Sequence, residues 1–280
     1  METKKTLSAL HSDIMCEHNK MYEGGDFFHS HDGYELFLML NGDMNFFIEQ
    51  NGQHLSHSSL VCVKPYAFHR REVIQTDIYD RIVINIRENT MKSLSTEKTD
   101  LSLCFNSLPE SGVNSCRLSE QETEQYITCS HKLIQALNSC EYGSDIMADS
   151  CIKQILVMVN RHINSSESIE PNNIMPPLVA NTIAFIDEHI TEEITLQILS
   201  DYFHHNGTYI SRCFKNIAGI TLQEYIISKK ITLAKKYLRE GYPPYKACDL
   251  TGFNNYSNFS RTFTKQVGYS PRKYQDNISP

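Results

Sequence analysis

One pattern of residues occurs twice in the last third of the chain, about fifty positions apart. The first copy spans residues 206–221 and the second spans residues 255–270. Each copy has a Ser-Arg step, Ser211-Arg212 and Ser260-Arg261, and an apolar pair at spacing i, i+4, namely Ile210 with Phe214 and Phe259 with Phe263. Apolar residues at that spacing share one helix face, so the repeat predicts two similar short helices.

A short helical pattern precedes each copy. Residues 195–203 open on Thr195, a good N-cap residue, and place apolar residues at spacings of three and four. The run His204 to Gly207 interrupts this pattern, and Pro243 to Leu250 stand at the matching place before the second copy. Helix, tight turn and helix is the layout that places a second helix in the DNA major groove.

A longer helix is predicted between the two copies. The run from Thr221 to Glu224 has the form of a capping box, and Gly241 supplies a stop just after Glu240. The sequence therefore predicts two helix-turn-helix units held at fixed separation on one helix. If they are about one DNA turn apart, roughly 34 Å, their second helices would enter successive major grooves, with bent DNA as one way to reach both.

With these residues in place, residues 178–277 resemble the DNA-binding domain of the AraC/XylS family of bacterial transcription regulators. The resemblance rests on Tyr209 to Lys215, Gly219, Ile231 with Ala234-Lys235, Gly252-Phe253, and Ser270 to Tyr274. It implies a sequence-specific, ligand-responsive regulator of double-stranded DNA, more often an activator, with RNA polymerase as a candidate partner. Pro243-Pro244 and Lys246 depart from the family's usual apolar and acidic helix start, which predicts a shortened or tilted helix there.

The N-terminal part of a recognition helix meets base edges, so the resemblance assigns candidate contacts residue by residue. The base-reading candidates are Thr208, Ser211 and Arg212 in the first unit and Ser257, Asn258 and Arg261 in the second. An arginine can donate two hydrogen bonds to guanine, and an asparagine can bond adenine in the same way. A surface salt bridge or a phosphate contact is the alternative role for these residues. Further phosphate candidates are Lys215, Lys265, Lys229, Arg272 and Lys273.

The net charge of −7 is unevenly distributed along the chain. Residues 174–280 contain 12 lysines and arginines against 9 aspartates and glutamates, a net +3, whereas residues 1–173 contain 14 against 24, a net −10. A basic part joined to an acidic one is typical of a DNA reader joined to a sensor. Nine cysteines without a CxxC pair favour reduced thiols in the cytoplasm, and no apolar stretch is long enough to span a membrane.

The N-terminal half contains short apolar runs separated by turns. The runs are Glu35 to Leu40, Met44 to Glu49, Leu60 to Val63 and Arg81 to Ile86, with turns predicted at Asn41-Gly42-Asp43 and at Asn51-Gly52. Short strands at this spacing suggest a β-sandwich or barrel. We therefore expect an α+β protein whose N-terminal domain is mainly β and whose C-terminal domain is all helical.

A set of imidazole and carboxylate groups lies on these strands: His29, His31, Glu35 and His69. Together with Gly42 and Pro65, it resembles the cupin jelly-roll pattern found in the sensing domain of many AraC-type regulators. Three roles stay open: lining a pocket for a sugar or another metabolite, which we favour, structural hydrogen bonding, and binding a transition metal. No catalytic residue and no cofactor is assigned. The alternative to a ligand-responsive regulator is a metal-binding cupin, a sensor or an enzyme, fused to DNA-binding helices.

The middle of the chain is predicted to be helical. Ser119 to Glu122 form a capping box that opens a helix towards Asn138, and a second stripe holds Met147, Cys151, Ile155, Val159 and Ile163. Such a pair can cap the β domain, but the resemblance favours a homodimer interface. The predicted order is a cupin-like sensing jelly roll at 1–115, the helical pair at 116–163, a linker at 164–177 and the DNA-binding domain at 178–280.

Overall fold

The computed structural model describes residues 6–10, 13–21, 26–74, 79–106, 114–165 and 173–278. The chain divides into two compact units. The first unit comprises Met1–Asp26 and Ser30–Met175, and the second comprises Phe27–His29 and Pro176–Pro280. The named strands lie in the first unit and the second unit is helical, so the expected α+β fold class is confirmed.

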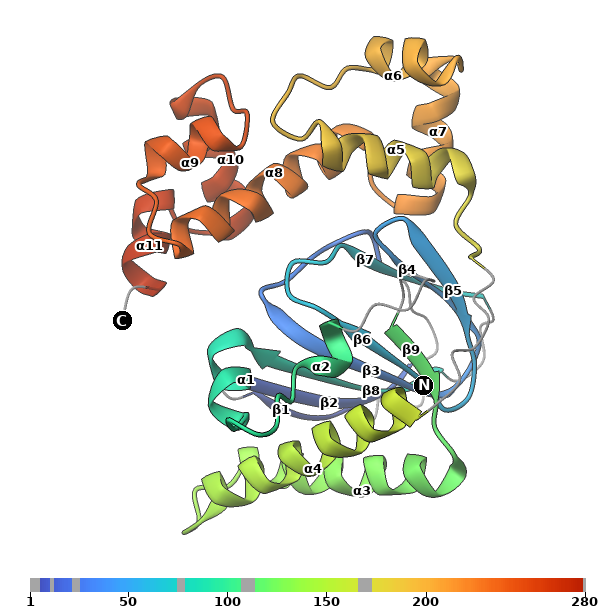
Figure 1. The fold of residues 1–280 in the computed structure, drawn as a ribbon, viewed down its shortest axis with the longest axis vertical. Coiled ribbons are helices and arrows are strands. Elements are labelled where there is room, and N and C mark those ends of the chain that lie inside the picture. Colours follow the sequence, from blue (N-terminus) through green and yellow to red (C-terminus); the bar gives the residue numbers. More distant parts are fainter. Residues whose placement is uncertain are drawn as a thin grey trace. The chain divides into compact units, whose positions relative to one another are not determined.

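Two antiparallel sheets form the framework of the first unit (Figure 1). The larger has six strands in the order β1 (Thr6–Leu10), β2 (Ile14–Met21), β8 (Tyr79–Arg87), β3 (Gly33–Asn41), β6 (Ser59–Val63) and β9 (Asn114–Arg117). The smaller has three strands in the order β5 (Asn51–Leu55), β4 (Met44–Ile48) and β7 (His69–Val73). Two stacked antiparallel sheets are the architecture expected for a cupin-like jelly roll.

Strands β3 and β8 are buried on both faces. One face of the pair joins the core under the helices, through Leu36, Leu38, Leu40, Ile82, Ile84 and Ile86. The other face joins the core between the sheets, through Phe37, Met39, Tyr79 and Val83. Because side chains alternate along a strand, consecutive residues of β3 belong to different hydrophobic cores.

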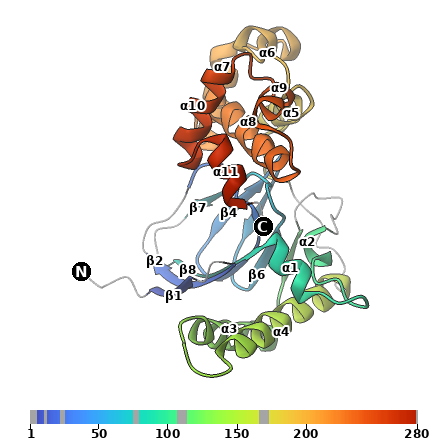
Figure 2. The same cartoon turned by 90° about the vertical axis from the view of Figure 1, so that its left-hand side faces the viewer.

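Four helices complete the described part of this unit: α1 (Glu88–Leu94), α2 (Leu103–Asn106), α3 (Glu120–Leu137) and α4 (Ser144–Ser165). Helix α3 begins at the predicted capping box, in which Ser119 and Glu122 bond each other's backbone N–H groups. Helices α3 and α4 lie together against the larger sheet (Figure 2). Their buried residues share the core beneath β3 and β8, so this pair does cap the sheet, whatever else it binds.

Two of the sequence-based expectations are wrong. Met147, expected on the apolar stripe of α4, is 54% exposed because it lies in the first turn of the helix. The turn expected at Asn51-Gly52 is occupied by Glu49 and Gln50, with Glu49 at φ 49°, and Asn51 already pairs with Ile48.

The second unit consists of α5 (Pro177–Glu188), α6 (Leu196–Phe203), α7 (Gly207–Ala218), α8 (Leu222–Arg239), α9 (Pro244–Leu250), α10 (Tyr256–Val267) and α11 (Pro271–Ile278). Helix α8 runs between α6 and α7 at one end and α9 and α10 at the other (Figure 1). Helix α9 has seven residues against eight in α6, and it begins with Pro244, where a missing N–H costs no intrahelical bond. Among helices in the described ranges, none combines the length and apolar character needed to cross a membrane.

The domain limits given above stay predictions. Helix α4 ends at Ser165 and α5 begins at Pro177, so both neighbouring helices reach into the expected linker 164–177. Residues 166–172 of that linker lie outside the described residues.

Candidate nucleic-acid interface and ligand cage

Helices α7 and α10 are built in the same way. The side chain of Asn206 accepts a hydrogen bond from the Thr208 N–H (2.9 Å), and Asn255 accepts one from the Asn258 N–H (3.0 Å). Each helix has twelve residues and stops at a glycine in the left-handed region, Gly219 at φ 74° and Gly268 at φ 85°. Matching start and stop signals explain why the sequence repeat produces two equivalent recognition helices.

The inward faces of both helices anchor them. Ile210 and Phe214 are buried in the first helix-turn-helix unit, where the ring of Phe214 lies 5.1 Å from that of Tyr225 on α8. Phe259 and Phe263 are buried in the second helix-turn-helix unit, with their ring centroids 5.7 Å apart. These four residues are core residues, as the i, i+4 pattern predicts.

The outward faces hold the predicted DNA contacts. Ser211 is half-buried, and the other candidates are exposed: Thr208, Arg212, Lys215, Ser257, Asn258, Arg261 and Lys265. The guanidinium of Arg212 lies 5.6 Å from the centre of the Tyr209 ring. Within the described part of the chain, neither Arg212 nor Arg261 forms an ion pair, so both guanidinium groups can serve an external acceptor.

One open cavity of about 690 Å³ receives residues from both helix-turn-helix units. It is lined by Ser211 of α7, by Asn258 and Thr262 of α10, and by Thr221 to Gln223 at the start of α8. The two recognition helices therefore border a common hollow. Glu192 and Glu193 also line it and would repel a phosphate placed beside them.

Lys229 does not fit the phosphate role considered for it. Its ammonium group is 2.7 Å from Asp187 Oδ1, and its side chain is 13% exposed. A lysine held in this way fastens α8 to α5. Arg272 is exposed beside Asp276 (3.2 Å), and Lys273 lies over the Tyr269 ring, so both remain accessible at the surface.

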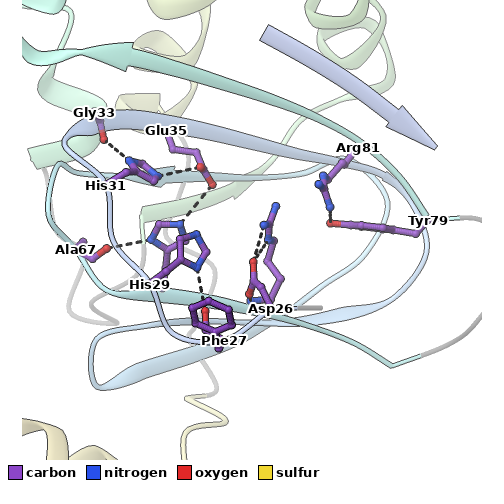
Figure 3. Close-up of polar contacts among 11 residues, drawn as sticks. Asp26, Phe27, His29, His31, Gly33, Glu35, Ala67, Tyr79 and Arg81 are labelled. Carbon is purple, nitrogen blue, oxygen red and sulfur yellow. Dashed lines mark hydrogen bonds and ion pairs between the residues drawn. The ribbon is translucent and has the colours of Figure 1, made fainter. Parts of the chain in front are cut away.

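In the first unit, His31 donates two hydrogen bonds (Figure 3). Its Nδ1 lies 3.0 Å from the Gly33 carbonyl oxygen and its Nε2 lies 3.1 Å from Glu35 Oε2. A carbonyl and a carboxylate can only accept, so both nitrogens carry protons and the ring is an imidazolium. Burial alone would lower the pKa of His31, but the hydrogen bond to Glu35 and its negative charge raise that pKa above the ordinary value.

Glu35 is 4% exposed and accepts from His31 on one oxygen. Burial alone would raise the pKa of this carboxyl group, but the hydrogen bond from His31 and the charges of His69, His31 and Arg71 hold it well below the usual range. Glu35 is therefore a buried carboxylate that stays ionised, a strong acceptor on the inner face of β3.

His69, on β7, is 1% exposed and donates through Nδ1 to the Ala67 carbonyl oxygen at 3.0 Å. Its Nε2 lies 3.8 Å from Glu35 Oε1, within ion-pair range but too long for a hydrogen bond. The metal-ligating atoms of His31, Glu35 and His69 all lie within 4.8 Å of one another. We call these three residues the cage. His29 is outside this group, and its Nδ1 contacts the Phe27 carbonyl oxygen at 2.9 Å.

Other polar groups near the cage were not singled out from the sequence. Arg71 donates through Nε to Asp26 Oδ2 (2.7 Å), and Arg81 donates to the Tyr79 hydroxyl (2.8 Å; Figure 3). The Nε of Arg81 is buried without a hydrogen-bond partner in the described structure. Polar residues on one face of a largely apolar strand, Arg81 and Asn85 on β8, were the available signal.

A pair of helix-turn-helix units seated on one connecting helix, with exposed arginines at matching positions, defines the second unit as a DNA-binding domain of the double helix-turn-helix class. Residues 199–277 match the family described as "Helix-turn-helix domain". The C-terminal part of the chain is therefore an AraC-type helix-turn-helix domain, similar to the matching part of curated transcription regulators.

The curated relatives agree with this placement. The chain is 34% identical over 98 residues to YobQ of Bacillus subtilis, an uncharacterized HTH-type transcriptional regulator, covering 35% of this chain and 41% of YobQ. It is 29% identical over 103 residues to the regulatory protein SoxS of Escherichia coli, covering 36% of this chain and 95% of SoxS. It spans about half the length of the first curated relatives it matches. Among solved structures, the crystal structure of an apo ToxT variant from Vibrio cholerae is similar at TM-score 0.44 and 15% identity, covering 96% of this chain and 99% of that one.

Proposed function

We propose that this protein is a sequence-specific transcription regulator that binds double-stranded operator DNA and responds to a small ligand in its first unit. The observation that carries the proposal is the pair of matched helices, α7 and α10, bordering one cavity of about 690 Å³. A duplex lying across the exposed faces of both helices would meet them in successive major grooves. Cytoplasmic location, contact with RNA polymerase and the absence of an enzymatic activity are parts of the same proposal.

In this role, Arg212 and Arg261 read guanine, Asn258 reads adenine, and Thr208, Ser211 and Ser257 supply shorter contacts to base edges. Lys215 and Lys265 sit in the last turns of α7 and α10, where their ammonium groups would meet phosphates. The exposure of these side chains and the lack of ion pairs at the two arginines, within the described part, support this division of roles.

The cage and its neighbours are the proposed effector site. An ionised carboxylate and charged nitrogen donors inside a mostly apolar sandwich suit a ligand rich in hydroxyl groups, such as a sugar, or another small metabolite.

Self-association through α3 and α4 belongs to the proposal as well. A surface cavity of about 1010 Å³ is lined by both helices, and Ile146 beside it is 70% exposed.

DNA binding is tested with duplexes that the full-length protein selects from a random-sequence pool. We expect one sequence class to be enriched, and an Arg212→Ala/Arg261→Ala variant to lose that class while keeping its fold by circular dichroism. If the wild-type protein enriches no sequence, DNA recognition is ruled out as proposed.

A thermal-shift screen of sugars and metabolites tests the effector, because a ligand of the native state raises its apparent stability.

A second candidate function is metal binding by the cage. Two imidazoles and one carboxylate within 4.8 Å of one another are a donor set that transition metals accept. Metal analysis of protein purified without a nickel column decides this point. A stoichiometric metal that is lost in His31→Ala and His69→Ala, but kept in His29→Ala, would support the metal sensor. Metal-free protein would exclude metal binding by the cage.

A further inference from the structure

Helix α8 by itself does not fix the mutual angle of the two helix-turn-helix units. It fixes how far apart the two helix-turn-helix units lie along its axis, but a small unit packed on one side of a helix can still pivot about its contact. DNA spaces its major grooves at a fixed distance and rotation, so two recognition helices must be held at a defined mutual angle to read one duplex. The structure contains a junction that supplies this restraint.

Lys230 lies at the middle of α8 and is 8% exposed. Its ammonium group donates to the Gly252 carbonyl oxygen at 2.9 Å and to the Glu192 carbonyl oxygen at 3.2 Å. Glu192 precedes α6 in the first helix-turn-helix unit, whereas Gly252 is in the turn between α9 and α10 of the second. One side chain thus bonds the segment that leads into the first helix-turn-helix unit and the turn of the second.

The same two segments touch directly. Gly252 has φ +67°, and a Cβ placed on it would lie 2.1 Å from the Thr191 carbonyl oxygen. Only a residue without a side chain lets the turn between α9 and α10 approach the 191–192 backbone so closely. Thr251, beside it, is fully buried. The segments 191–192 and 251–253 therefore form a close backbone contact, with Lys230 beneath it.

The hydrogen bonds of the junction offset the free energy lost by burying the Lys230 ammonium group. Burial lowers the pKa of Lys230, so the protein holds the ammonium in place by giving it two carbonyl acceptors. The Phe253 ring adds to the junction, with its centre 5.9 Å from the ammonium nitrogen. A side chain without an N–H donor at position 230, such as methionine, would leave both carbonyls without this shared donor.

We propose that Lys230 is a positioning residue: it ties the two helix-turn-helix units together through Glu192 and Gly252 and so sets the mutual angle of α7 and α10. It touches no DNA in this role. The inference rests on the proposed function, because the angle matters only if both helices read one duplex. It predicts that Lys230 determines how strictly the protein demands one spacing between the two parts of its operator.

The mechanical part is tested without DNA. Nitroxide labels are attached to Asn216→Cys on α7 and Gln266→Cys on α10, in a full-length chain whose Cys129, Cys140 and Cys213 are serine. Distances are measured by double electron–electron resonance for the wild-type residue, Lys230→Met and Lys230→Arg. We expect one narrow distribution for lysine and arginine and a broadened one for methionine. Lys236→Met, an exposed position on the same helix, is the matched control and should stay narrow.

The functional part uses the duplexes selected by the wild-type protein, together with copies carrying one base pair more or less between the two recognised parts. Lys230→Met should bind the original duplex about tenfold more weakly if about one molecule in ten holds the competent angle. It should also discriminate less between the three spacings, whereas Lys230→Arg should restore discrimination. Lys230→Gln is measured in the same way in case methionine prevents folding.

The outcomes separate the two proposals. Unchanged distance distributions in Lys230→Met and Lys230→Gln overturn the junction, even if the wild-type protein binds DNA. A broadened distribution in a protein that selects no DNA supports the junction and overturns the proposed function. Broadening with unaltered spacing preference shows that the junction does not set specificity, which contradicts the inference.

Discussion

Nδ1 of His18 lies 2.7 Å from Nε2 of His131, and this contact joins strand β2 to helix α3. His18 donates through its other nitrogen to Asp80 Oδ1 (2.7 Å), and Lys20 pairs with the second oxygen of Asp80 (2.9 Å). One ring of the histidine pair must accept, so the pair holds at most one extra proton. If both rings were charged, two N–H groups would face each other.

This arrangement predicts that the contact between His18 and His131 weakens in mild acid. Burial, and then the nearby charge of His18, lower the pKa of His131 in the folded protein, whereas the unfolded chain has a pKa of about 6.5. A lowered histidine pKa gives stability that is present above about pH 6.5 and lost as the pH falls further. We expect His131 to lower the unfolding temperature between about pH 7.5 and 5.5, against the opposite contribution of His31, whose pKa is raised. His131→Gln should reduce this drop and the exposed His205→Gln should not; scanning calorimetry showing equal pH slopes would contradict the assignment.

Removing one recognition arginine should affect one base pair. We expect Arg212→Ala to lose about 1 to 3 kcal/mol of specific binding and to relax preference at a single position, because a bidentate contact to guanine disappears. Arg261→Ala should do the same at a different position about one helical turn away. Fluorescence anisotropy on the selected duplex and its single mismatches measures both effects. Wild-type discrimination at every position in Arg212→Ala would refute its role in base reading.

The contact at Gly252 predicts a large loss of stability on adding one methyl group. Ala at a positive φ costs about 1 to 2 kcal/mol by itself. Gly252→Ala should cost clearly more, because its Cβ would also lie 2.1 Å from the Thr191 carbonyl oxygen. Gly241→Ala is the matched control, since Gly241 has φ +89° with no atom within 4 Å of the added carbon. Urea unfolding of the two variants compares them, and equal losses would show that the close approach is not constraining.

Self-association should depend on Ile146. An aspartate in place of this 70% exposed residue would replace an apolar side chain by a charge on the surface proposed to meet a second copy. We expect Ile146→Asp to raise the dimer dissociation constant by about tenfold or more in sedimentation velocity, equivalent to about 1.4 kcal/mol. Ile74→Asp, at a 50% exposed position elsewhere in the same unit, should leave it unchanged. A wild-type monomer at all concentrations would end the dimer proposal.

Helices were predictable where caps and periodicity agreed. The capping boxes at Ser119 and Thr221 start helices where the sequence indicates, and the two repeated helices are capped at positions 206 and 255, where the two copies begin. A cap is a local interaction encoded within four residues. Strand β2 was missed, since its run Ile14–Met21 has three apolar residues followed by four polar ones rather than an alternating pattern, and its partner β8 lies more than fifty residues away. Pairing between strands so far apart in the chain leaves little pattern within the sequence of either strand.

The functional sites are also predictable only where their residues follow a local sequence pattern. Exposed recognition residues followed from the repeat, and three of the four candidate ligand residues, His31, Glu35 and His69, lie together, although His31 precedes β3 rather than lying on it. Lys230 stands in the run Ser228-Lys229-Lys230, which reads as a solvated helix face. Only the fold brings carbonyl groups from positions 192 and 252 to its ammonium, so no pattern within the helix could reveal the junction.

Strand β3 contributes side chains to two hydrophobic cores. Leu36 faces the helices α3 and α4, and its neighbours Glu35 and Phe37 face the interior that holds the cage. Because both faces of β3 share one backbone, a ligand that displaces the backbone at Glu35 would displace Leu36 with it. An effector bound in the interior would in this way reach the core beneath α3 and α4 through β3 itself.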